Sequence, residues 1–186
     1  MRKMMPFGQH LCAEQNRRAF DIGTFVNRLP TADPLRLREA GHDVQVASPR
    51  GGAVPVDPRS ERDPDRHPRW IEAAQALADA ARLDAVDAAG FDAVFIAGGH
   101  GAMLDFPGHP ALGRLLAAFH AQEKPIAAVC HGPAAFVGVT RADGRRLVDG
   151  YTLTAFSDLE EKLLKLDGVV PFLLSSRLRE LGATVQ

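Results

Sequence analysis

Cysteine and aromatic residues are scarce in this chain of 186 residues. It contains 2 cysteines, Cys12 and Cys130, and 6% of its residues are aromatic. Two cysteines cannot form the disulfide framework that small secreted domains use. The sequence therefore predicts a protein of a reducing compartment, with the cytoplasm as its location.

The chain also lacks an excess of charge and a long apolar run. Its 22 basic and 23 acidic residues leave a formal net charge of −1, which provides no overall field to attract nucleic acid or an anionic membrane. No apolar run approaches the roughly 18–20 residues that a membrane-spanning helix needs. The basic start, Met1 to Pro6, is not followed by the apolar segment of an export signal. We therefore expect neither nucleic acid nor a membrane as a partner.

The chain does contain a regular alternation of strand and helix patterns, and its length suits one domain over residues 1–186. Strand-like runs occur at 43–48, 92–97, 125–130 and 152–155, and helix-like segments at 35–40, 70–86, 109–122, 157–161 and 171–181. This alternation predicts an α/β fold, a mostly parallel sheet with helices on both faces. Residues 1–33 are atypical, because no run of strand quality is apparent before the first helix.

The sharpest chemical feature is a cysteine at the end of a strand. Cys130 follows the apolar run, and the small residues Ala128 and Gly132 on either side allow a tight turn into a helix. This is the arrangement of a nucleophile elbow, with cysteine in place of serine. We expect the helix that starts after His131 to lower the pKa of the thiol. A buried structural cysteine is the alternative.

A glycine-rich loop follows the neighbouring strand. Its sequence is Gly98-Gly99-His100-Gly101, and the backbone N–H of Gly99 together with that of His131 predicts an oxyanion site. Gly98 and His100 are candidate pocket residues, because loops at adjacent strand ends meet where open α/β sheets bind ligands. The loop lacks the Gly-Lys-Ser/Thr ending of a phosphate-binding loop. No histidine or cysteine spacing indicates a metal site, so we predict neither metal nor cofactor.

Several segments together resemble the PfpI/ThiJ superfamily. They are residues 46–58, 96–107, 129–134, 150–161 and 170–174, and the resemblance spans about 34–182. Within that superfamily they are most similar to the branch of heat-shock chaperone HchA and glutathione-independent glyoxalase III. The resemblance implies a flavodoxin-like sandwich, a stress-response role, a homodimer and one more strand beyond Gln186. It also implies that Cys130 is the nucleophile and His131 its histidine partner.

The glyoxalase branch uses its thiolate to attack the aldehyde of methylglyoxal, after which a base moves a proton between two carbons and hydrolysis releases lactate. The branch has an acid after a Pro-Phe-Leu-Leu segment to orient the histidine, and here Ser175 and Ser176 occupy that place. It also has a glutamate near the nucleophile, where this chain has Asn27 in the nearest register. We find no support in the spacing for Glu14, Asp21 or Asp33 as a replacement.

Three hypotheses about function follow from these features. The first is a cofactor-free cysteine enzyme of the glyoxalase III type that acts on small reactive carbonyls. The second is a non-catalytic chaperone-like protein with a degenerate triad and an exposed apolar patch. The third is an amidase or peptidase of the PfpI type with an amide substrate. The sequence favours an enzyme.

Overall fold

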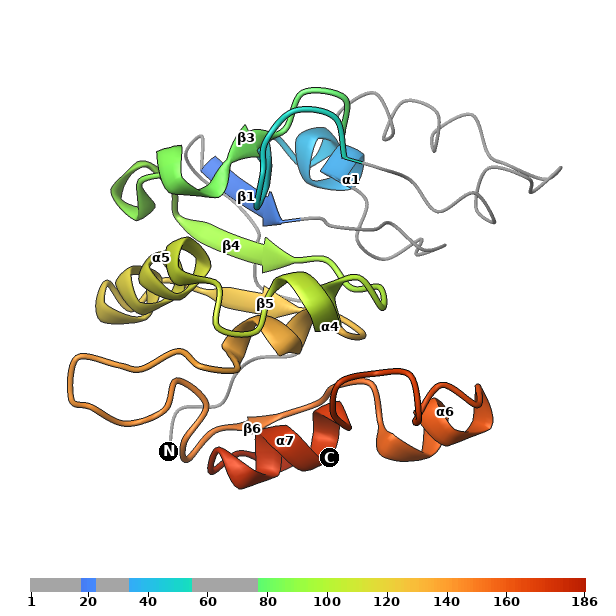
Figure 1. The fold of residues 1–186 in the computed structure, drawn as a ribbon. Coiled ribbons are helices and arrows are strands. Elements are labelled where there is room, and N and C mark those ends of the chain that lie inside the picture. Colours follow the sequence, from blue (N-terminus) through green and yellow to red (C-terminus); the bar gives the residue numbers. More distant parts are fainter. Residues whose placement is uncertain (1–17, 23–33, 55–76) are drawn as a thin grey trace, which may run out of the picture.

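The computed structural model describes residues 18–22, 34–54 and 77–186 (Figure 1). The strands are β1 (Arg18–Ile22), β2 (Asp43–Ser48), β3 (Ala81–Arg82), β4 (Ala93–Ile96), β5 (Ile126–Ala128), β6 (Thr152–Leu153) and β7 (Thr184–Val185). The α-helices are α1 (Pro34–Glu39), α4 (Ala102–Asp105), α5 (Pro110–Ala121), α6 (Asp158–Leu163) and α7 (Leu174–Glu180). Short 3-10 helices span Leu83–Ala85, Ala88–Gly90 and Gly132–Phe136.

Five of these strands form one parallel sheet in the order β3-β2-β1-β4-β5. Parallel neighbours need crossover connections, and the helices that follow β4 supply one of them. The predicted α/β class is therefore confirmed. A second, two-stranded parallel sheet joins β6 to β7 and lies with α6 and α7 beyond the β5 side of the main sheet (Figure 1).

Helix α5 is buried along one stripe, as its spacing predicts. Leu112, Leu116 and Phe119 have no exposed surface, and they recur at the three- and four-residue intervals of an amphipathic helix. His109 caps the helix by accepting a hydrogen bond at Nδ1 from the backbone N–H of Leu112, 3.3 Å away. Helix α5 thus anchors the core beneath β4 and β5, the two strands that lead into the candidate site.

The prediction that no strand precedes the first helix is wrong. Strand β1 lies in the middle of the sheet, with Ala19 in register with Val44 of β2 and with Ala93 of β4. In the sequence, Arg18 and Asp21 interrupt the apolar run. A central strand receives backbone hydrogen bonds from two neighbours, so tertiary pairing stabilises it where its own composition does not indicate a strand.

The helix predicted over 70–86 is also wrong from residue 77 onward, and residues 70–76 lie outside the described part. Residues 77–79 form a turn, and β3 then pairs with β2 through Ala81 and Ala47. Gly52 and Ala80 exchange two backbone hydrogen bonds of 2.7 and 3.0 Å. Alanine has the highest helix propensity of any residue, but propensity is a weak determinant of structure, and pairing with a sheet edge overrides it here.

The C-terminal predictions agree better with the structure. Strand β6 lies within the predicted 152–155 run, and α6 begins at the predicted Ser157 cap. Helix α7 begins at Leu174, three residues later than predicted, and ends before Gly182. Among the helices in the described part of the chain, none is long and apolar enough to cross a membrane.

Candidate active site

Cys130 lies on the sharp turn that the sequence predicts. Strand β5 ends at Ala128, and Cys130 then adopts a φ of +59°, a conformation that side-chain-bearing residues rarely occupy. The backbone N–H of Gly132 closes the turn onto the carbonyl of Val129 at 2.8 Å. A side chain at Gly132 would place its Cβ 2.6 Å from the carbonyl oxygen of Ile96. The elbow therefore requires glycine at this position.

The glycine-rich loop after β4 lies directly against this elbow. Strands β4 and β5 are parallel neighbours, with Ile96 in register with Ala128, so their carboxyl ends meet at the same edge. A Cβ on Gly98 would lie 2.6 Å from the Cβ of Cys130, and Gly99 has a φ of +109°. Glycine at position 98 therefore allows the two loops to approach this closely, and glycine at position 99 allows the positive φ of the loop.

His131 and Cys130 are hydrogen-bonded to each other. The sulfur of Cys130 lies 3.3 Å from Nδ1 of His131. The imidazole is fully buried and stacks on the ring of Phe156, with the ring centroids 4.2 Å apart and an interplanar angle of 29°. Phe156 also donates its backbone N–H to the carbonyl of Cys130 at 2.9 Å. The structure thus brings the predicted pair of Cys130 and His131 together, and Phe156, from a second segment of the chain, contacts both residues.

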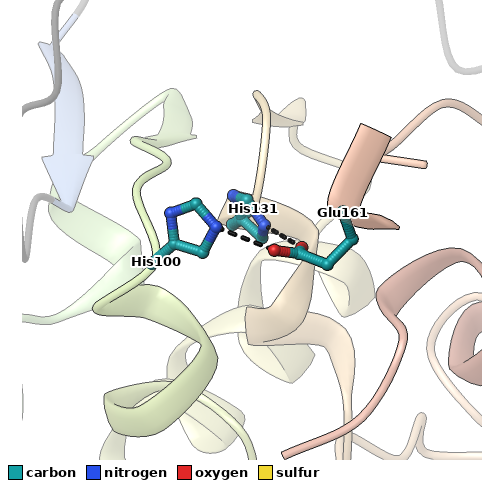
Figure 2. A group of neighbouring side chains, drawn as sticks. All are labelled: His100, His131 and Glu161. Atoms are coloured by element: carbon teal, nitrogen blue, oxygen red, sulfur yellow. Dashed lines mark hydrogen bonds and ion pairs between the residues drawn. The ribbon is translucent and has the colours of Figure 1, made fainter. Parts of the chain in front are cut away.

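A buried glutamate completes the arrangement, and the sequence reasoning missed it. Glu161, on α6, is only 2% exposed. Its Oε2 lies 2.8 Å from Nε2 of His131, and its Oε1 lies 2.9 Å from Nε2 of His100. Figure 2 shows this carboxylate reaching from its helix toward both rings. Cys130, His131 and Glu161 therefore form a continuous chain of hydrogen bonds.

The serines expected at the position of the acid do not take part in this chain. Ser175 donates its hydroxyl to the backbone carbonyl of Phe156 at 3.1 Å, and Ser176 donates to Asp158 at 2.5 Å. The interpretation that this chain lacks the orienting acid is therefore wrong. Glu14, Asn27 and Asp33 lie outside the described residues, as does the side chain of Asp21.

The sequence does not single out Glu161, because acids in the first turn after Ser157 indicate only a favourable helix start. In the structure, Leu159 and Leu163 of α6 are 66% and 72% exposed, and Glu161 is the buried residue of the helix. The neighbouring Glu160 closes the helix start, since it accepts a hydrogen bond from the backbone N–H of Ser157 at 2.8 Å. This capping box, which the sequence does contain, fixes the first turn and leaves the next acid, Glu161, to point inward.

Burial decides the protonation states of the reacting pair. It raises the pKa of the Cys130 thiol, although hydrogen bonds from the backbone N–H groups of Gly99 and His131 act in the opposite direction. It lowers the pKa of His131, against the opposing effect of its hydrogen bond to Glu161. The predicted lowering of the thiol pKa is therefore wrong. The segment after Cys130 is a 3-10 helix of only five residues, and desolvation by burial is the largest influence on the pKa of the thiol.

Neutral His131 has the tautomer that a base for Cys130 requires. An ionised carboxylate only accepts hydrogen bonds, so Nε2 of His131 carries the hydrogen that is donated to Glu161. Nδ1 is then left with its lone pair toward the sulfur. This arrangement can remove the thiol proton at the moment of attack and can hold the resulting imidazolium against Glu161.

Among the described residues, one group of side chains could hold a metal ion, and it consists of Glu161 and the two histidines hydrogen-bonded to it. Ligand atoms of His100, His131 and Glu161 all lie within 4.8 Å of one another. The hydrogen bonds of 2.8 and 2.9 Å already use these atoms. The other described histidine contacts lie elsewhere: His109 caps α5, and His120 lies 3.2 Å from the hydroxyl of Tyr151. Cys12 and His67 lie outside the described residues.

Comparison with known proteins places this geometry in a family. The profile of the DJ-1/PfpI family matches residues 31–167. Glutamine amidotransferase-like class 1 domain-containing protein 1 of Homo sapiens is 32% identical over 151 residues, 79% of this chain and 66% of that protein. Glutathione-independent glyoxalase hsp3101 of Schizosaccharomyces pombe is 33% identical over 168 residues, 79% of this chain and 66% of that protein. The chain thus spans slightly less than two thirds of the length of these curated relatives.

A solved crystallographic structure is similar over nearly all of the chain. It superposes with a TM-score of 0.83 at 41% identity, and the match covers 92% of this chain and 82% of that one. These matches confirm the relationship that the sequence motifs indicate, and with it the flavodoxin-like form of the α/β fold.

Proposed function

The chain belongs to the DJ-1/PfpI family, and from this membership and its site geometry we propose that it is a cysteine-dependent enzyme of the glyoxalase III type. It converts small reactive carbonyls such as methylglyoxal without a cofactor, as a cytoplasmic homodimer in the response to carbonyl stress. The observation that carries this proposal is the hydrogen-bonded chain from Cys130 through His131 to the buried Glu161.

Attack on the aldehyde begins with proton transfer within this chain. As the sulfur of Cys130 approaches the aldehyde carbon, Nδ1 of His131 takes the thiol proton, and Glu161 stabilises the imidazolium that forms. The oxygen of the resulting hemithioacetal develops negative charge. The backbone N–H groups of Gly99 and His131, which act to lower the pKa of the Cys130 thiol, are the donors that we assign to that oxygen, and they stabilise it.

The remaining steps rearrange and release the product. The hydrogen on the aldehyde carbon moves to the neighbouring carbon, which converts the hemithioacetal into a thioester of lactate. Water then cleaves the thioester and regenerates the thiol. One carbon is oxidised and its neighbour is reduced, so that no external oxidant or reductant enters the reaction.

The name of the S. pombe relative supports this substrate class, whereas that of the human relative suggests an amidotransferase-like protein. An amidase or peptidase activity is therefore the second candidate. A cysteine, a base and two backbone donors also suit acyl transfer from an amide.

The direct test is the formation of lactate from methylglyoxal by the purified chain, without glutathione and in the presence of a chelator. We expect lactate from the wild-type protein and none above background from Cys130→Ala, with the same melting temperature for both. Hydrolysis of glutamine or peptide amides without lactate formation would support the amidase. Neither activity, together with suppression of aggregation by both proteins, would support the chaperone-like alternative.

A further inference from the structure

His100 shares the carboxylate of Glu161 with His131, but the two imidazoles have different environments. His131 is fully buried, whereas the side chain of His100 is 34% exposed. Both nitrogens of His131 are used, one toward Cys130 and one toward Glu161. His131 therefore has no ring nitrogen left for a substrate, whereas the exposed part of His100 can be reached by a small molecule from solvent.

The hydrogen bond to Glu161 also fixes the tautomer of His100. Its Nε2 lies 2.9 Å from Oε1 of the carboxylate, which can only accept, so Nε2 carries the hydrogen. Nδ1 then has a free lone pair, and the described part of the chain contains no hydrogen-bond donor to it. A neutral imidazole held in this way can take up a proton at Nδ1 and return it.

The ring of His100 lies beside the pair formed by Cys130 and His131. His100 directly follows Gly98 and Gly99, and a Cβ on Gly98 would lie 2.6 Å from the Cβ of Cys130. The His100 and His131 rings lie with their centroids 4.2 Å apart. A two-carbon unit bonded to the sulfur therefore lies beside the loop that carries His100.

We propose that His100 is a second acid–base residue, which moves the proton between the two carbons of the bound carbonyl substrate. This role rests on the proposed function. Nδ1 of His100 removes the hydrogen of the former aldehyde carbon, and the electron pair of that bond forms a carbon–carbon double bond. The ketone oxygen receives the displaced pair and becomes an enediolate oxygen. His100 then returns the proton to the second carbon. The hydroxyl proton of the first carbon passes to the enediolate oxygen, and the product of these two transfers is the thioester.

Loss of His100 should therefore slow the proton transfer that leads to lactate while the reactivity of the Cys130 thiol is retained. In His100→Ala, we expect the rate of lactate formation to fall by about 10²- to 10⁴-fold, the usual contribution of a general acid–base group. Alkylation of Cys130 by iodoacetamide should stay within about twofold of wild type, because His131 and Glu161 still face the thiol. Intact-protein mass spectrometry should show the methylglyoxal adduct accumulating on Cys130. Added imidazole should restore part of the lactate rate, which it would not do for a residue with a purely structural role.

The matched control is His120→Ala, because His120 is also hydrogen-bonded through Nε2 but contacts Tyr151. This variant should form lactate at the wild-type rate. An active wild type with an equally active His100→Ala would overturn the role of His100 and leave the proposed function intact. Parallel loss of alkylation and lactate formation would also overturn it, because His100 would then act through the thiol. A wild type that forms no lactate would overturn both proposals.

Discussion

The elbow at Cys130 and helix α6 contribute to one site in very different ways. The elbow is a local structure: strand β5, a residue at φ +59° and Gly132 follow one another within a few residues. Helix α6 is distant in sequence and delivers a single buried carboxylate, Glu161, to His131. The reacting atoms thus depend on a short motif, whereas their orientation depends on how a remote helix packs.

Within α6, two adjacent acids show the same contrast on a smaller scale. Glu160 is exposed and stabilises the helix start through Ser157. Glu161 is buried and holds two imidazoles. Residue type and helix position are nearly the same, so that side-chain direction alone separates a structural acid from a candidate functional one.

Among variants that test the contrast between Glu161 and Glu160, we expect Glu161→Gln to have the largest effect on the rate of lactate formation. The amide keeps the volume of the side chain but offers one acceptor and one donor where two imidazoles now donate. We expect the rate of lactate formation to fall by about 10²- to 10⁴-fold, because His131 loses both its tautomer and its counter-charge. Glu160→Gln is the matched control. We expect it to form lactate at the wild-type rate and to lose about 0.3–1 kcal/mol of the free energy of unfolding, because the helix start is weaker. Equal rates in the two variants would contradict the assignment of Glu161.

Substitution of Gly132 tests how strictly the elbow depends on its backbone. In Gly132→Ala the new Cβ would lie 2.6 Å from the carbonyl oxygen of Ile96, so we expect a loss of about 1–3 kcal/mol in the free energy of unfolding. Gly90→Ala is the control, since a Cβ there meets nothing within 4 Å, and its effect should stay within about 0.5 kcal/mol. Chemical denaturation measures both values. A neutral Gly132→Ala would show that the elbow tolerates a side chain.

The reactivity of Cys130 should report the direction of its pKa shift. Burial raises the pKa of the thiol, so the midpoint of iodoacetamide alkylation against pH should lie above the ordinary thiol value of about 8.5. The measurement is made in a Cys12→Ala background to isolate one thiol. A midpoint well below that value would mean that a preformed thiolate, rather than proton transfer to His131, activates the sulfur.

His131 should set the acidic limit of activity. Its pKa is lowered by burial, so the imidazole stays neutral to a pH below its ordinary pKa of about 6.5. The acidic limb of kcat/KM should therefore lie below that pH. The unfolded chain takes up this proton at a higher pH than the folded one, so stability should fall as the pH drops through the same window. An acidic limb above pH 7 would contradict the environment of His131.

The smallest effect is expected at the serines that the sequence places at the acid position. Ser175→Ala and Ser176→Ala should each lose about 1 kcal/mol or less of stability, the net contribution of one hydrogen bond. Their rates of lactate formation should stay within about twofold of wild type, because neither hydroxyl contacts His131 in the structure. A large loss of activity in Ser175→Ala alone would indicate that its bond to Phe156 positions the ring stacked on His131.

Sequence patterns predicted the fold well where the segment carried its own signal. The spacing of α5, the Ser157 cap and the buried β4 run each produced the expected element. Strand β1 and the segment from residue 77 to 86 were mispredicted, because their conformation comes from pairing with neighbouring strands. Local composition does not record such pairing.

The sequence by itself determined the elbow and its partner. Cys130, His131 and the glycines at 98, 99 and 132 are linked by short-range geometry, because a sharp turn and a close approach of two loops admit few residue types. Tertiary structure alone decided which acid orients His131, that His100 shares it, and that the thiol pKa is raised rather than lowered. These properties depend on what packs around a side chain and on how much water it loses, and a linear pattern contains neither.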